Sequence, residues 1–309
     1  MKNRKLYLCV TVILALILSG CAPVVDDKDI PENYNIYASF LPSYMLADLV
    51  IGENVPGMKL HLLIQPQDGC MRSYNLSDWD AYMAMNADAV ILIGNGFEAF
   101  ESALMGLGEN GPSVISASSS LVLDSTGYSE NEESHLNGAN PWLFLSVSGA
   151  YDLTEAIAAN MIALDPDYEE IYIKNLNEAY ESFEKLKNEI ALLREKTDSE
   201  MPVALAHEGL GYIANDFGLN VVAQIDRESG AYPEDGELKD MLRMLSESGA
   251  QAVLIEKQAP NALLRAFEEA GYTVVLIDTL SAGTGKMGGE AYFERMLENA
   301  RAVSGAIKK

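Results

Sequence analysis

The sequence predicts an α/β protein of two lobes, each a mainly parallel sheet flanked by helices, joined by one long backbone helix. In both halves of the chain, short apolar runs alternate with segments of helical periodicity, a pattern typical of parallel strands covered by helices. Between the halves, apolar residues recur at helical spacing as far as Lys196, and a helix of that extent would be roughly 46 Å long. A chain of 309 residues accommodates about two domains.

The first half of the folded region contains four predicted strands. They occupy residues 35–40, 58–64, 88–93 and 113–115. The third is a continuous apolar run, which indicates a strand buried on both faces. Helices are expected at residues 42–50, 78–87 and 97–105, the second of them capped by Ser77.

Residues 123–139 interrupt this alternation. The stretch is polar, holds four acidic residues without a basic one, and includes His135. We interpret it as a loop at the edge of a cleft. A helix at 148–163 follows, and Asp165-Pro166 then supplies an N-cap and a proline at the first position of the long helix. A coiled coil is the alternative, but a single segment without sustained heptads does not support one.

The second half repeats the alternation of strand and helix. Strands are expected at 202–206, 219–224, 252–255 and 273–277, and helices at 209–217, 237–248, 262–270 and 291–307. We therefore place the lobes at residues 34–164 and 199–309, with the backbone helix at 165–198 between them.

The N-terminal segment has the features of an export signal. Three basic residues precede an apolar run, residues 6–18, that is too short for a confident membrane span. The run ends in Leu18-Ser19-Gly20-Cys21, which resembles the lipobox of bacterial lipoproteins. We therefore expect a signal peptide at 1–20, a lipid-anchored linker at 21–33, and an extracytoplasmic protein anchored to the bacterial cell membrane through Cys21. The alternative is a cleaved secretory signal in which this cysteine is incidental.

The charge balance narrows the range of partners. The chain has 21 basic and 46 acidic residues, a net charge of −25, and removal of the signal peptide changes that to −28. Such acidity argues against binding nucleic acid, whose phosphates the chain would repel. It favours cations or basic partners, although a soluble, self-repelling surface is the simpler interpretation.

Cysteine usage singles out one thiol. Cys9 leaves with the signal peptide and Cys21 is acylated, so the processed chain is expected to keep Cys70 alone. No internal disulfide can then form, although the compartment would permit one.

Motifs for catalysis and nucleotide binding are incomplete. Lys286 ends a run that looks like a phosphate loop, but Met287 replaces the required Ser or Thr. His207-Glu208 opens like a zinc-protease motif, yet Gly211 stands where the second histidine belongs. Three histidines in the whole chain leave little material for acid–base catalysis. We therefore predict that the protein is not an enzyme.

Three potential metal ligands follow predicted strands. Cys70, His207 and Asp278 each lie after a strand or in the loop leaving it, where α/β lobes place ligand-binding groups. A thiolate, an imidazole and a carboxylate form a plausible set for zinc or another borderline divalent metal. Spacing alone leaves an ordinary structural role open for each residue.

Several segments, in order, resemble the metal-binding solute-binding proteins of ABC importers, the zinc/manganese group with a helical backbone. The resemblance covers nearly all of residues 34–305. The segments that carry it are Ala38-Ser39-Phe40-Leu41-Pro42, Ser77-Asp78, Ala87-Asp88-Ala89-Val90-Ile91, Asn140-Pro141-Trp142, Leu164-Asp165-Pro166, His207-Glu208-Gly209-Leu210-Gly211-Tyr212, Ile255-Glu256-Lys257-Gln258 and Val275-Leu276-Ile277-Asp278. No one motif is decisive, and their shared order carries the resemblance.

The resemblance implies a lipoprotein that captures a divalent metal ion between two lobes and delivers it to a membrane permease and its ATPase. His207 and Asp278 match the family's second-lobe ligands, whereas Cys70 and Trp142 stand where two first-lobe histidines are usual. Because Trp142 cannot ligate a metal, the fourth position is open, water-filled or supplied by another residue, for which His135 is the candidate. The loop that carries His135 could equally be a weak metal collector or a plain solvated turn. The thiolate of Cys70 would favour Zn²⁺ over Mn²⁺, which stays the alternative metal.

Four residues are expected at the cleft besides the ligands: Arg72, Trp142, Glu208 and Glu256. An Arg72 that faces inward would argue against a cation, or would pair with an acid. Trp142 and Arg72 also suit another ligand in the same fold, a metal chelate or organic molecule such as cobalamin, haem or a siderophore. A surface adhesion lipoprotein with a degenerate site is the third alternative. His61 is expected to be an ordinary sheet residue.

Overall fold

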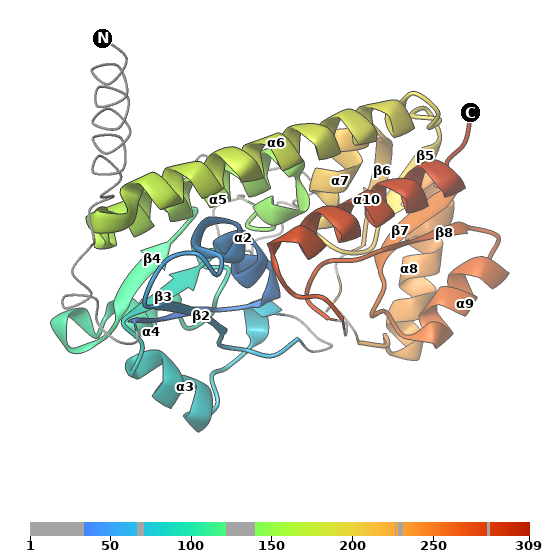
Figure 1. The fold of residues 1–309 in the computed structure, drawn as a ribbon. Helices are drawn as coiled ribbons and strands as arrows, with labels where there is room; N and C mark the ends of the chain where they lie inside the picture. Colours follow the sequence, from blue (N-terminus) through green and yellow to red (C-terminus); the bar gives the residue numbers. More distant parts are fainter. Residues whose placement is uncertain (1–33, 67–70, 122–139, 226, 228–230, 283–284) are drawn as a thin grey trace, which may run out of the picture. The chain divides into compact units, whose positions relative to one another are not determined.

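Two four-stranded parallel sheets form the frame of the fold (Figure 1). The computed structural model describes residues 34–66, 71–121, 140–225, 227, 231–282 and 285–309. The first sheet has the strand order β2-β1-β3-β4 and the second β6-β5-β7-β8, with every neighbouring pair parallel. Chain contacts separate Asn33–Lys309 from Met1–Glu32, and both sheets belong to the first of these units.

The elements alternate along the chain as the sequence predicts. The strands are Tyr34–Ala38 (β1), Met58–Leu62 (β2), Ala89–Leu92 (β3), Ser113–Ser116 (β4), Pro202–Leu205 (β5), Asn220–Gln224 (β6), Ala252–Glu256 (β7) and Thr273–Ile277 (β8). The α-helices are Leu41–Ile51 (α2), Asp78–Met85 (α3), Glu101–Met105 (α4), Val147–Leu164 (α5), Glu169–Arg194 (α6), Leu210–Phe217 (α7), Asp235–Ser248 (α8), Asn261–Glu269 (α9) and Gly289–Ala306 (α10). The predicted fold class is confirmed.

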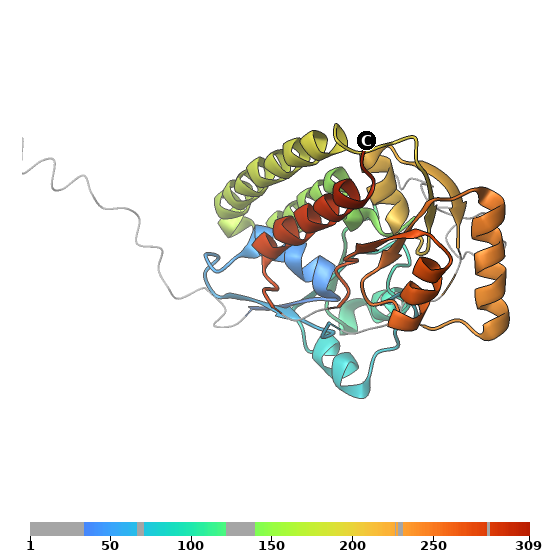
Figure 2. The same cartoon turned by 90° about the vertical axis from the view of Figure 1, so that its right-hand side faces the viewer.

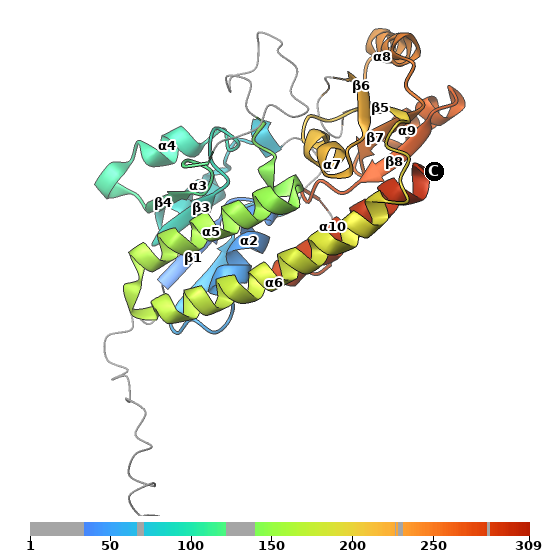
Figure 3. The same ribbon diagram turned by 90° about the horizontal axis from the view of Figure 1, so that it is seen from above.

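The helices α2, α5, α6 and α10 pack against one another and join the two sheets. Seen from above, α6 runs beside α5 and α10 (Figure 3), and the side view shows these three helices running together on one side of the sheets (Figure 2). Helix α10 belongs to the second half of the sequence, yet it packs on α2 of the first half. One apolar core continues through this layer, from Ile36 in β1 through Phe183 and Tyr292 to Leu205 in β5.

Local sequence signals explain two of the first-half elements. All four residues of β3 are buried, which confirms the prediction of a strand covered on both faces. Helix α3 begins with a capping box, in which Ser77 Oγ accepts the backbone N–H of Asp80 at 3.2 Å and the Asp80 carboxylate accepts the N–H of Ser77 at 3.0 Å. Ser77 is therefore the N-cap that the sequence predicts.

The long helix starts later than predicted. Residues Pro166–Tyr168 form a 3-10 turn, and α6 runs for 26 residues from Glu169, about 39 Å at the usual rise. Asp165 does not cap the helix with its side chain. Its carboxylate instead accepts a hydrogen bond from the hydroxyl of Tyr172 at 3.1 Å. Asp165 thus stands at the predicted N-cap position with Pro166 at the first position of the turn, but its side chain makes no capping bond.

The helix expected at 97–105 is reduced to α4, Glu101–Met105. The preceding residues Gly94, Asn95 and Gly96 have positive φ angles of 90°, 52° and 74°, which turn the chain sharply. Glu98 then points back under the end of β3 and accepts the backbone N–H of Ile93 at 2.8 Å and of Gly94 at 2.9 Å. Residues 97–100, the segment that carries this side chain, are not helical.

Other expectations fall outside the part of the chain that the structure describes. The signal peptide, Cys21, the linker and the loop at 123–139 with His135 lie there, as does Cys70. Within the described ranges, no helix combines the length and the apolar composition that crossing a membrane requires.

Candidate functional site at the carboxyl ends of β5, β7 and β8

Three of the predicted site residues lie at one edge of the second sheet. His207 follows β5, Glu256 is the last residue of β7, and Asp278 follows β8. These strands are neighbours in the order β5-β7-β8 and all parallel, so their carboxyl ends meet at one edge. In α/β folds this is the edge where ligands bind.

His207 is buried, with 4% of its surface exposed. Burial lowers the pKa of its imidazole to about 4; the nearby Glu256 carboxylate raises this pKa, and the guanidinium groups of Arg227 and Arg72 lower it. The ring is therefore neutral at pH 7. The backbone N–H of Gly209 donates to its Nδ1 at 3.1 Å, which leaves the ring hydrogen on Nε2.

Trp142 packs against His207 from the first half of the chain. The two rings meet edge to face with centroids 4.4 Å apart and an interplanar angle of 83°. Gly209 makes this approach possible, because a Cβ there would lie 2.8 Å from Trp142 Cγ. The indole is 1% exposed, and its Nε1–H donates to Glu208 Oε1 at 2.7 Å.

Glu208 accepts a second donor at the same oxygen. Arg72 Nη1 donates to Glu208 Oε1 at 2.6 Å, so Arg72 faces the site and pairs with an acid, one of the two outcomes that the sequence left open. The Asn140 side-chain amide donates to the backbone carbonyl of Glu208 at 3.0 Å. We call Arg72, Asn140, Trp142 and Glu208 the interlobe latch, because three residues of the first half hold one residue of the second.

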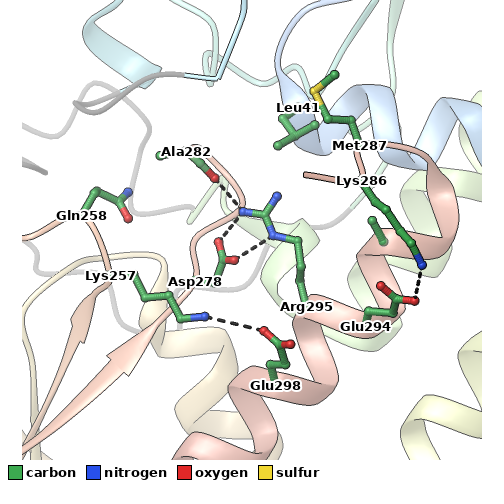
Figure 4. Close-up of a pocket in the computed structure, with 11 residues that line it drawn as sticks. Leu41, Lys257, Gln258, Asp278, Ala282, Lys286, Met287, Glu294, Arg295 and Glu298 are labelled. Carbon is green, nitrogen blue, oxygen red and sulfur yellow. Dashed lines mark hydrogen bonds and ion pairs between the residues drawn. The ribbon is translucent and has the colours of Figure 1, made fainter. Parts of the chain in front are cut away.

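The other two acids of the edge also have arginine partners. Glu256 forms an ion pair with Arg227, and both side chains are almost fully buried. Asp278 is held at both oxygens, by Arg295 Nε at 2.7 Å and Arg295 Nη2 at 2.6 Å (Figure 4). Two parallel hydrogen bonds of this kind are the strongest form of carboxylate recognition by arginine.

A cavity of about 530 Å³ lies beside this last pair. Its wall includes Asp278 and Arg295 together with Leu41, Lys257, Gln258 and Glu298 (Figure 4). Leu41 opens α2 in the first half of the chain, so both halves of the chain contribute to the cavity.

The residues that sequence reasoning missed are Arg227 and Arg295. The sequence predicts that the closing helix packs beside the strand that precedes Asp278, so a residue of that helix could have been expected near Asp278. Which residue it is depends on how the helix packs, and the sequence pattern does not encode this. Arg227 stands in an irregular segment that carries no pattern. Within the described residues, no three His, Cys, Asp or Glu side chains are grouped closely enough to hold a metal ion.

The donors that are described do not form a ready metal site. A metal-ligating histidine usually donates a hydrogen bond from its second ring nitrogen, whereas Nδ1 of His207 accepts one. Asp278 is engaged by Arg295. Cys70 and His135, the other predicted ligands, lie outside the described residues. A cation bound here would therefore require the His207 ring and the Arg295 guanidinium to change partners.

Comparison with known proteins gives one consistent result. The family model described as "Zinc-uptake complex component A periplasmic" matches residues 36–306. The zinc-binding lipoprotein AdcA of Streptococcus pneumoniae is 25% identical over 316 residues, covering 97% of this chain and 60% of AdcA. The manganese-binding lipoprotein MntA of Halalkalibacterium halodurans is 22% identical, with 94% of each chain covered. This chain thus spans about 60% of the length of the AdcA relatives that it matches.

Solved structures share the fold. The solute-binding protein FpvC of Pseudomonas aeruginosa, in complex with Ni²⁺, superimposes with a TM-score of 0.75 at 22% identity, covering 89% of this chain and 97% of FpvC. The Zn(II)-bound ZnuA-like domain of Streptococcus pneumoniae AdcA gives a TM-score of 0.72 at 22% identity, covering 90% and 100%. With the family model matching most of its length, this chain belongs to the zinc-uptake component A family of metal-binding substrate-binding proteins of ABC transporters.

Proposed function

We propose that this chain is the extracytoplasmic, lipid-anchored receptor of an ABC importer, which captures a divalent metal ion between its two halves and delivers it to the permease. Zn²⁺ is the metal that the donor set suits best. Lipidation at Cys21 would keep the receptor at the membrane where the permease and its ATPase operate. Family membership and the relatives named for zinc or manganese support the proposal.

The observation that carries the proposal is the state of His207. A neutral imidazole, buried at the end of a central strand and next to the first half of the chain, is the form of histidine that binds metals, and it would do so here by exchanging its contact with the Gly209 N–H for the ion. Asp278, at the end of β8, supplies a carboxylate from the same edge. Cys70 would add a thiolate, which selects zinc over manganese, and His135 is the candidate for a fourth ligand.

The test is a titration of the metal-free, processed chain with Zn²⁺, Mn²⁺ and Ni²⁺ by calorimetry. We expect one Zn²⁺ per chain, bound more tightly than Mn²⁺, and a loss of roughly 100-fold or more in zinc affinity in the Cys70→Ser/His207→Ala variant. His61→Ala is the matched control, because His61 stacks on Tyr37 in the first sheet with ring centroids 4.8 Å apart. Equal zinc affinity in the wild type and the double variant would contradict the proposal.

A metal chelate is the second candidate, favoured by the size of the cavity. About 530 Å³ is more space than a metal ion needs, and Lys257 and Arg295 in its wall are basic groups that an anionic chelate would meet. In the same calorimeter, zinc premixed with citrate would then bind where zinc alone does not. Binding of zinc alone, unchanged by citrate beyond simple competition, would exclude this candidate.

A further inference from the structure

The Arg295 guanidinium occupies both carboxylate oxygens of Asp278, the oxygens that a metal ion would need. Arg295 reaches Asp278 from α10, and its Nη2 also donates to the carbonyl oxygen of Ala282 at 2.8 Å. The two side chains are only 16% and 15% exposed, so solvent screens the pair less than it would a surface pair. A guanidinium in this position neutralises the carboxylate and repels any divalent cation that approaches it.

We propose that Arg295 is an affinity-determining residue that occupies Asp278 in the metal-free protein and moves to Glu298 when a divalent cation binds. The inference rests on the proposed function, because it takes Asp278 as a ligand of the captured metal. In this proposal the Arg295 guanidinium competes with the metal ion for Asp278, so that each cation bound displaces the arginine.

The fold provides a second position for the guanidinium. Glu298 lies three residues after Arg295 on α10, the spacing at which side chains on one helix face meet. Both residues line the cavity of about 530 Å³, so the guanidinium can move without displacing packed atoms. Glu298 holds only a loose ion pair, with its Oε2 at 3.8 Å from Lys257 Nζ (Figure 4).

The structural role of fixing the strand end at Asp278 is already filled by a neighbour of Arg295. Asn299 Nδ2 donates to the backbone carbonyl of Asp278 at 2.8 Å, and the backbone N–H of Asp278 donates to Asn299 Oδ1 at 2.7 Å. Asn299 is 1% exposed. These two hydrogen bonds fix the end of β8 on α10 without Arg295, so the arginine can leave Asp278 while the strand end stays in place.

The test compares zinc affinities of the full processed chain by calorimetry. We expect Arg295→Met to bind Zn²⁺ about tenfold more tightly than the wild type, because the competitor is gone, and Glu298→Gln to bind about threefold more weakly, because the displaced arginine loses its second partner. Arg301→Met is the matched control: it removes one positive charge from an exposed position of the same helix and should change affinity less than twofold. If Arg295→Met does not fold, Arg295→Lys, which keeps the charge but not the two-point contact, should bind about threefold more tightly.

Two further measurements separate this inference from the proposed function. Asp278→Asn should weaken zinc binding, and a crystal structure of the zinc-loaded wild type should have Arg295 on Glu298. If the wild type binds zinc through Asp278 while Arg295→Met binds equally or more weakly, the inference is overturned and the proposed function stands. If Arg295 stays on Asp278 in the loaded structure, the inference is likewise wrong. If no variant binds zinc, both are overturned.

Discussion

The two sheets end in acidic residues that are stabilised in different ways. At the end of β3 in the first sheet, Glu98 is buried and held by neutral donors, with Ser39 Oγ at 2.6 Å and the backbone N–H groups of Ile93 and Gly94. At the edge of the second sheet, Glu256 and Asp278 are held by guanidinium groups. The first edge is a structural cap, and the second is an array of ion pairs.

The difference shows which edge can exchange partners. Burial and, to a smaller extent, the nearby Glu101 raise the pKa of Glu98 to about 7 despite the hydrogen bonds that lower it, so this acid is half neutral near pH 7 and closed to a ligand. The acids of the second edge are paired with arginines, and an arginine can be replaced by another cation. The second edge is therefore the one that can exchange a side-chain cation for another.

Removing one arginine from the second edge has the largest expected effect on stability. Arg227→Met removes the guanidinium that pairs with the buried Glu256, and breaking a buried ion pair by removing one of its members costs about 3–5 kcal/mol of unfolding free energy. Urea denaturation at pH 7 measures the loss. The double variant Arg227→Met/Glu256→Leu, which removes both charges, should recover most of it. A loss below about 1 kcal/mol in the single variant would mean that the pair is not buried as described.

The pH dependence of the unfolding free energy tests the role of Glu98 at the first edge. The pKa of Glu98 is about 7 in the folded protein against 4.5 in the unfolded chain, so the folded state holds the extra proton between these values. Its contribution to stability is complete below pH 4.5 and is lost as the pH rises to about 7, by about 3 kcal/mol.

The measurement is the unfolding free energy from pH 4 to pH 8 in wild type and in Glu98→Gln. The variant should lack this part of the decline with rising pH, whatever its absolute stability. Glu109→Gln, the same charge change at an exposed position of the first lobe, should keep the wild-type profile. Identical slopes in all three proteins would show that Glu98 titrates at its ordinary value.

Sequence reasoning reached the fold because its signals are local. The continuous apolar run at β3, the Ser77 cap and the alternation of strand and helix each depend on neighbours in the chain, and the structure confirms them. The site depends on contacts between distant residues, such as Arg72 with Glu208, which are 136 positions apart. No periodicity encodes such a pair, so the positions of His207 and Asp278 at a strand end could be predicted, but their partners could not.

A smaller effect is expected at Gly209, where Trp142 of the first half of the chain packs against the second edge. A Cβ at position 209 would lie 2.8 Å from Trp142 Cγ and 2.9 Å from Leu145 Cδ1, both buried. Gly209→Ala should therefore push the indole away from His207 and destabilise the protein by about 1–3 kcal/mol.

Tryptophan fluorescence, measured in a Trp79→Phe background so that Trp142 is the emitter, and thermal unfolding report this change together, because the indole also loses its short contact with Glu208. The matched control is Gly236→Ala in the first turn of α8, where a Cβ meets no atom within 4 Å of the described structure and alanine favours the helix by about 1 kcal/mol. The pair of variants thus separates a close approach between the halves from the general effect of replacing a helical glycine. Gly209→Ala could instead be as stable as Gly236→Ala and leave the indole emission unchanged. Trp142 would then not pack closely against the second edge, and the interlobe latch would rest on Arg72 and Asn140 alone.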